Sequence, residues 1–176
     1  MRIVLERYYG DSRVTKSVMK VFEERGAECS DDLECSGSSG KLLLACEGRE
    51  PCFADYSEIF PGCSRCCLAV GVYRCKVVST DLSPMTLMVI KSPGHRCYRI
   101  AWDYTAQVRH NMVLVGESDG YEDPEWREIV RSRETFERLT RLVYQAYGTG
   151  EEIWLEVVNR IEEFSDKENS CCNAIV

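Results

Sequence analysis

The central part of the chain carries five short runs rich in Val, Ile, Leu and Tyr, and these constrain the fold more than any other feature. The runs are KLLLAC from Lys41, CLAVGVYRCKVVS from Cys67, TLMVI from Thr86, CYRIAWDY from Cys97 and NMVLVG from Asn111. Such residues favour strands, and several of the runs are bounded by Pro, Gly or Ser. We therefore expect a small, largely antiparallel sheet, with RIVLERYY at the start of the chain as a further strand.

One connection between these runs has a recognisable turn sequence. The segment KSPGHR, between Ile90 and Cys97, contains a Pro-Gly pair, which predicts a hairpin between its flanking strands. The run from Cys67 is also compatible with a buried helix, because a short continuous apolar run does not distinguish a strand from a helix.

Apolar residues at helical spacing predict a helix near the N-terminus. Asp11 and Ser12 are candidate N-caps. The helix is expected over about residues 12–25, with one apolar face formed by Val14, Val18, Val21 and Phe22.

The last third of the chain predicts two more helices. Asp123-Pro124 is a typical helix start, and apolar residues continue from there to Ala146, with a break near Ser132. Thr149 and Glu152 form a capping box for a second helix, whose stripe is Ile153, Trp154, Val157, Val158, Ile161 and Phe164. The short YGTG segment between the two helices predicts an antiparallel helical hairpin.

These elements together predict an α+β fold: a small, largely antiparallel sheet packed by an N-terminal helix and a C-terminal helical hairpin. Residues 1–165 are expected to form a single globular domain, and residues 166–176 a flexible C-terminal tail. Trp126 and Trp154 lie on the expected helix stripes, so we assign both to the core.

Eleven cysteines are the most unusual part of the composition. Cys63 and Cys66 form a C-x-x-C pair, and His95 and Cys97 lie close together near the predicted hairpin, so these four residues are candidate ligands of one structural zinc ion. The alternative is reduced, scattered thiols that act as small apolar residues, as expected for Cys75 within a strand-like run. Disulfides are a third alternative, although an odd number of cysteines leaves one unpaired.

The formal net charge is −7, and its distribution limits the class of partner. Residues 117–176 carry 15 acidic and 7 basic side chains, so we expect no nucleic-acid binding. The acidic helices are expected to attract a basic protein partner, with a merely solvated face as the alternative. The residues concerned are Glu134, Glu137, Glu151, Glu152, Glu156, Glu162 and Glu163.

The sequence shows no transmembrane segment, because its longest apolar run, CCLAVGVY, is far shorter than the roughly 20 residues that cross a bilayer. The first residues do not resemble a signal peptide, since Glu6 and Arg7 lie where an apolar stretch is required. We therefore expect a cytoplasmic protein.

These observations predict a non-enzymatic protein-interaction or regulatory module. One alternative is a cysteine-dependent enzyme that uses Cys97 or Cys67 with a histidine. Another is a sensor of a small ligand bound between sheet and helices. Residues 86–102, TLMVIKSPGHRCYRIAW, resemble the closing segment of V4R ligand-sensing domains, and that resemblance implies ligand sensing.

Overall fold

The computed structural model describes seven segments, residues 1–11, 13–23, 40–51, 67–80, 83–89, 98–103 and 111–161. This described part contains nine strands and one helix. In chain order they are β1 Arg2–Gly10, β2 Val14–Glu23, β3 Lys41–Pro51, β4 Gly71–Thr80, β5 Ser83–Val89, β6 Tyr98–Ala101, β7 Met112–Ser118, β8 Ile129–Val130, α1 Ser132–Gly148 and β9 Ile153–Asn159.

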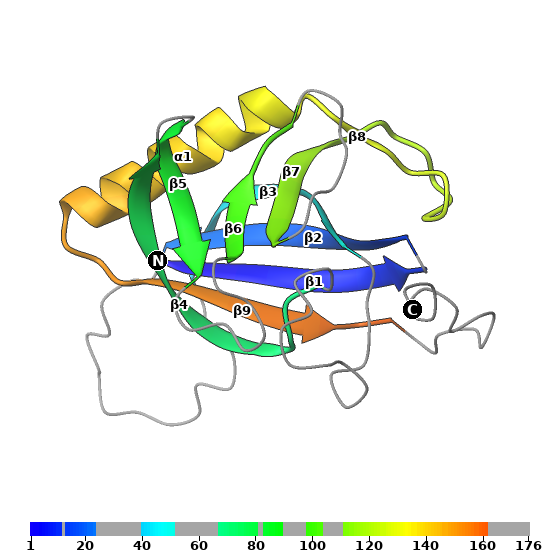
Figure 1. Cartoon of the computed structure of the whole chain (residues 1–176), viewed down its shortest axis with the longest axis horizontal. Helices are drawn as coiled ribbons and strands as arrows, with labels where there is room; N and C mark the ends of the chain where they lie inside the picture. The colour runs from blue at the N-terminus through cyan, green and yellow to red at the C-terminus, as the bar shows by residue number, and fades with distance from the viewer. Residues whose placement is uncertain are drawn as a thin grey trace, which may run out of the picture.

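All nine strands belong to one mixed sheet with the order β3-β2-β1-β9-β4-β5-β6-β7-β8. The pairs β1–β9 and β6–β7 are parallel, and the other neighbours are antiparallel. Residues 47–49 of β3 also pair with residues 114–116 of β7, near the other end of this order. The sheet therefore curls into a half-barrel (Figure 1).

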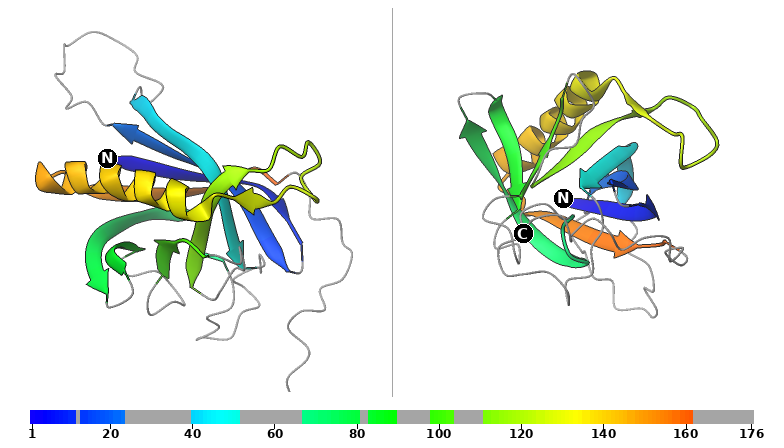
Figure 2. Two further views of the ribbon diagram at one scale, coloured as in Figure 1. Left: turned by 90° about the horizontal axis from the view of Figure 1, so that it is seen from above. Right: turned by 45° about the vertical axis from the view of Figure 1, so that its right-hand side comes forward.

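Helix α1 lies across one side of the curled sheet and contacts β7, β5, β3 and β9 (Figure 2). It contributes Phe136, Leu139, Val143 and Ala146 to the same buried cluster as Ile3, Leu5, Met19, Val113, Leu155 and Val157 of the strands. Burial of each large apolar side chain contributes roughly 1.5–3 kcal/mol, so the helix and the sheet stabilise each other through this core.

The predicted N-terminal helix is wrong, because this segment forms strand β2. Asp11 does not cap a helix; its Oδ1 accepts the backbone N–H groups of Arg13 and Val14 at 2.7 and 2.8 Å and so fixes the β1–β2 turn. Alternate residues of β2 face the interior, namely Thr15, Ser17, Met19 and Val21, and all four are fully buried. Pairing with β1 and β3 on its two sides outweighs the helical spacing of the valines.

The predicted C-terminal helical hairpin is also wrong. Its second helix is strand β9, in which Ile153, Leu155 and Val157 are buried at a period of two residues. This strand lies between β1 and β4, so both of its edges are hydrogen-bonded. Its β-branched residues fit a central strand as well as they fit a helical stripe, and the available partners decide between the two.

Part of the first C-terminal helix is confirmed. Helix α1 begins at Ser132, close to the expected break, and four apolar residues of the expected helix are buried on it, together with Ser132 and Thr135. The four are Phe136, Leu139, Val143 and Ala146. Arg131 adopts the left-handed conformation with φ 48°, which separates α1 from β8. Residues 123–131 therefore do not belong to a helix.

The positions of the predicted strands are confirmed, but the expected α+β fold with a small, largely antiparallel sheet is wrong, because the described residues form one nine-stranded mixed sheet and a single helix. Each of the five central runs contains a strand, β3, β4, β5, β6 or β7, and RIVLERYY lies within β1. The run from Cys67 becomes a strand from Gly71 onward, which rejects the buried-helix alternative. The predicted pairing of the strands on either side of KSPGHR is present as the β5–β6 ladder, whereas the turn itself, residues 91–96, lies outside the described residues.

Candidate functional site

One tyrosine and one tryptophan side chain are exposed on the loop between β7 and β8, and this loop is the best candidate site in the described structure. We define the β7–β8 loop as residues 119–128. Tyr121 and Trp126 are 63% and 64% exposed, so the assignment of Trp126 to the core is wrong. Trp154, by contrast, is half-buried on β9. Large aromatic side chains with this exposure on an ordered surface often mark contact sites.

The β7–β8 loop is attached to the sheet by Lys16 of β2. The Lys16 ammonium donates three hydrogen bonds to loop carbonyl oxygens, to Pro124 at 2.8 Å, Glu125 at 2.7 Å and Arg127 at 2.9 Å. An ammonium group has three N–H donors, so all of them are used on the loop backbone. Burial and the facing guanidinium of Arg49 lower the pKa of Lys16.

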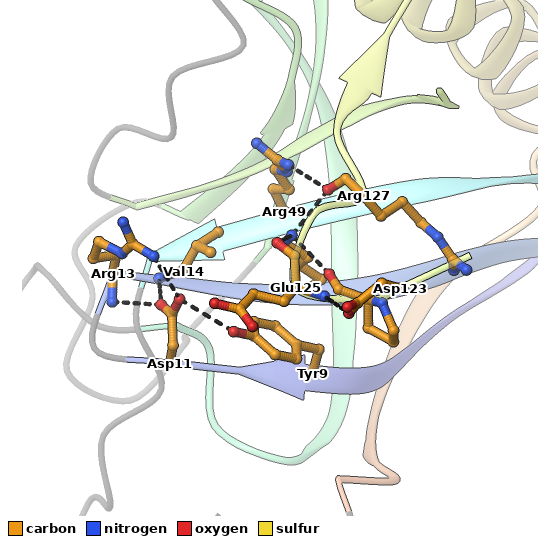
Figure 3. Close-up of polar contacts among 10 residues, drawn as sticks. Tyr9, Asp11, Arg13, Val14, Arg49, Asp123, Glu125 and Arg127 are labelled. Carbon is orange, nitrogen blue, oxygen red and sulfur yellow. Dashed lines mark hydrogen bonds and ion pairs between the residues drawn. The ribbon is translucent and has the colours of Figure 1, made fainter. Parts of the chain in front are cut away.

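Arg49 of β3 and Arg127 of the loop provide further attachments. Arg49 Nη2 donates to the Arg127 carbonyl oxygen at 2.7 Å, and Arg49 Nη1 lies 2.7 Å from the Glu128 carboxylate. The Arg127 guanidinium donates to the carbonyl oxygens of Tyr121 and Glu122 within its own loop, at 2.9 and 3.0 Å. Arg49 therefore holds the loop from the sheet, as Figure 3 shows, and the Arg127 guanidinium holds it across its own span.

Hydrogen bonds to backbone N–H groups within the loop also fix its conformation. The Asp123 carbonyl oxygen accepts the N–H groups of Trp126 and Arg127, and the Asp123 side chain accepts the N–H of Glu125 at 2.9 Å. The Asp119 N–H donates to Glu128 at the other end of the loop. Gly120 has φ 90°, a conformation that residues with a side chain rarely adopt. Asp123 thus caps a single turn, which explains why the sequence resembles a helix start here.

The charge of the loop is strongly negative. It contains five acidic residues and one basic residue, Arg127, which is engaged within the loop. Among the described residues, the carboxylates of Glu122, Asp123 and Glu125 form no ion pair. The outer surface of the loop therefore combines exposed aromatic rings with uncompensated negative charge.

A turn cluster beside the loop adds one more carboxylate, that of Asp11, to this region (Figure 3). The Asp11 carboxylate bonds to the β1–β2 turn and lies 3.4 Å from the Tyr9 hydroxyl. Burial raises the pKa of Tyr9, and the nearby carboxylates of Asp11 and Glu125 raise it further. The Lys16 ammonium lies 5.2 Å from the centroid of the Tyr9 ring, so this cluster and the loop share one lysine.

A second polar cluster is fully buried inside the curled sheet. Arg7 and Glu50 form a bidentate ion pair with distances of 2.7 and 2.8 Å, and the Tyr98 hydroxyl donates to Glu50 Oε1 at 2.7 Å. The Leu68 N–H donates to the same carboxylate, and its carbonyl oxygen accepts from Arg7. These hydrogen bonds tie residue 68 to strands β1, β3 and β6, which is a structural role.

The predicted cysteine and histidine sites are only partly visible. Cys63, Cys66, His95 and Cys97 lie outside the described residues, so zinc binding there stays a prediction. In the described segments, no group of three or more His, Cys, Asp or Glu side chains could hold a metal ion. Cys67 is fully buried beside Arg7 and Tyr98, which does not suit a nucleophile that must meet a substrate.

Cys75 is 6% exposed and belongs to the core, as its position in a strand-like run had indicated. Burial raises the pKa of Cys75 and of Cys46, in each case to about 12, so both thiols are protonated at neutral pH. His110 and the predicted flexible tail, residues 166–176, also lie outside the described residues.

The acidic surface expected on the helical hairpin does not form as predicted. Glu137 pairs with Arg133, Glu152 with Arg74 and Glu156 with Arg2. Glu151 lies 3.1 Å from the N-terminal ammonium of Met1, while Glu162 and Glu163 are outside the described residues. Four of the five described carboxylates are thus paired with a cation, whereas Glu134 on α1 has no ion pair among the described residues.

Sequence reasoning missed Lys16, Arg49, Tyr121 and Trp126 as parts of one site. The apolar spacing around Lys16 and around Trp126 predicts a helix at each position, and the structure has a strand and a loop there. A usable signal was present, because DGYEDPEW contains two turn dipeptides, Asp-Gly and Asp-Pro, directly after a strand-like run. Contacts between residue 16 and residues 124–127 are too distant in sequence to follow from local pattern.

Comparison with protein-family models, curated proteins and solved structures gives no match. Within the segments that the structure describes, no helix combines the length and the apolar character needed to cross a membrane.

Proposed function

We propose that this chain is a non-enzymatic protein-interaction module whose β7–β8 loop binds a positively charged segment of a protein partner. The observation that carries this proposal is the 64% exposure of Trp126 on a loop whose backbone is bound by Lys16 and Arg49. An aromatic side chain on a preorganised loop binds with a small loss of conformational entropy, and Trp and Tyr are enriched among the residues that dominate binding energy.

The charge of the loop selects the chemistry of the partner. Uncompensated carboxylates at Glu122, Asp123 and Glu125 attract lysine and arginine side chains over several ångströms and increase the rate of encounter. The exposed rings of Tyr121 and Trp126 add cation–π contacts at short range, worth roughly 0.5–1 kcal/mol each at exposed sites. We place this module in a reducing compartment such as the cytoplasm, a choice supported by the free thiols of Cys46 and Cys75.

The experiment measures binding of a labelled peptide rich in lysine and arginine by fluorescence anisotropy. Wild-type protein is expected to bind it, and to bind an acidic peptide of the same length far more weakly. Trp126→Ser is expected to weaken binding about tenfold or more, as for a residue at the centre of an interface. Tyr147→Ser is the matched control, because Tyr147 is 60% exposed on α1, away from the β7–β8 loop.

The electrostatic part is tested with the double variant E122Q/E125Q. Its affinity for the cationic peptide should fall, and the dependence of affinity on salt concentration should become shallower, because fewer charges contribute. Equal affinity of wild-type and Trp126→Ser protein would contradict the proposal. So would equal affinity of the wild type for the basic and the acidic peptide.

A further inference from the structure

Lys16 and Arg49 are directly opposite each other in the β2–β3 ladder, although both are positively charged. Like charges at facing positions of a sheet destabilise the ladder unless other groups compensate them. The two residues are also 3% and 8% exposed, so water compensates little of this repulsion. Stable pairing of β2 with β3 at this position therefore requires acceptors from another part of the chain.

The β7–β8 loop supplies these acceptors. Three carbonyl oxygens, those of Pro124, Glu125 and Arg127, converge on the Lys16 ammonium at 2.7–2.9 Å. Arg49 donates to the Arg127 carbonyl as well and pairs with Glu128. Carbonyl dipoles whose negative ends converge on one point repel one another, so this loop conformation needs a cation at that point.

We infer that Lys16 is the positioning residue of the binding loop: its ammonium fixes the backbone of residues 124–127 and thereby the orientation of Trp126 toward a cationic partner. This inference rests on the proposed function for its effect on binding, whereas the positioning can be measured without a ligand. Lys16 itself is buried beneath the loop, so it acts through Trp126 and does not belong to the contact surface.

The first test is amide hydrogen exchange of the full chain. The N–H groups of Trp126 and Arg127 donate to the Asp123 carbonyl at 3.2 and 3.1 Å and report on the order of the loop. In Lys16→Met, which keeps the methylene stem and removes the ammonium, these amides should exchange about tenfold faster. Lys20→Met is the matched control, since Lys20 is on the same strand but its ammonium binds Glu6 at 2.7 Å.

The second test is the affinity for the lysine- and arginine-rich peptide. Lys16→Met should bind it about tenfold more weakly, and Lys20→Met should bind it as the wild type does. Wild-type affinity in Lys16→Met overturns the inference, even if loop exchange rises, because loop order would then not govern binding. Unchanged exchange of the two amides also overturns it.

The two proposals can fail separately. If the wild type does not bind the peptide, the proposed function fails, and the exchange measurement still decides whether Lys16 orders the loop.

If Lys16→Met does not unfold cooperatively, hydrogen exchange and peptide affinity are both measured on Lys16→Gln instead, because the glutamine amide keeps two N–H donors without the charge. Arg49→Met, which leaves the three carbonyl bonds of Lys16 in place, should change exchange less than Lys16→Met; an equal change would overturn the special role of Lys16.

Discussion

Arg7 of β1 and Glu50 of β3 form an ion pair in which both side chains are completely buried, with Arg7 Nε 2.7 Å from Glu50 Oε2. The two strands are not neighbours in the sheet, because β2 lies between them. The pair therefore spans the concave side of the curled sheet. Burial alone would lower the pKa of Arg7, but the adjacent Glu50 carboxylate raises it overall, so the guanidinium stays charged.

Removal of one partner of this pair should destabilise the protein strongly. Arg7→Met or Glu50→Gln is expected to lower the free energy of unfolding by about 3–5 kcal/mol, because each leaves a buried polar or charged group without its partner. The double variant R7M/E50L should lose much less than the sum of the two single effects. Urea denaturation of the four proteins measures this coupling, and additive losses would show that the two residues do not act as a pair.

Gly116 of β7 allows β8 to approach and so places one end of the β7–β8 loop. A Cβ atom at this position would overlap with Ile129 Cγ2 and would lie 2.7 Å from the Val130 carbonyl oxygen. Gly116→Ala should therefore cost about 1–3 kcal/mol of stability. Gly148→Ala is the control, because its Cβ would have no atom within 4 Å. It should be neutral or stabilise α1 by up to about 1 kcal/mol, and thermal unfolding of both variants checks this contrast.

Cys46 and Cys75 should be unreactive toward thiol reagents in the native protein at pH 8. Both are buried, and burial raises each pKa from the ordinary 9.0 to about 12. Mass spectrometry after brief alkylation should find these two thiols unlabelled in native protein and labelled in urea. Fast native labelling of either residue would contradict its burial.

Because of the same two thiols, we expect the free energy of unfolding to fall at alkaline pH. Between pH 9 and 12 the unfolded chain releases thiol protons that the folded chain retains, so stability falls as pH rises, by about 1.4 kcal/mol per pH unit for each thiol. The variant C46A/C75A should show a shallower decrease of the unfolding free energy over this range. An unchanged slope would show that the native thiols titrate normally.

Because of Asp11, we expect the stability of the protein to depend on pH in the acidic range. Burial alone would raise the pKa of Asp11, but the N–H groups of Arg13 and Val14 and the charge of Arg13 lower it below the ordinary 3.8. Its stabilising contribution is therefore present above pH 3.8 and is lost as pH falls through the lower pKa of the folded state. Asp11→Asn keeps the turn acceptor without the charge. At pH 7 the free energy of unfolding of the wild type should be larger than that of Asp11→Asn, and the difference should disappear in strong acid. Urea denaturation at each pH measures both free energies.

Local sequence was sufficient for several elements. The runs rich in Val, Ile and Leu predict β1 and β3–β7, because β-branched and aromatic residues bounded by turn residues rarely fit another structure. The stripe formed by Phe136, Leu139 and Val143 likewise predicts most of α1, since no alternating pattern competes with it.

Tertiary structure decided the remaining elements and the candidate site. The segments of β2 and β9 fit both a helical and a strand period, and only their partners on two sides, β1 with β3 and β1 with β4, favour the extended form. The single turn at Asp123 resembles a helix start, but Lys16, 107 positions earlier in the sequence, holds its carbonyl oxygens in a loop. Such contacts depend on strand pairing between distant segments, so the exposure of Trp126 follows from the folded sheet and not from the residues around it.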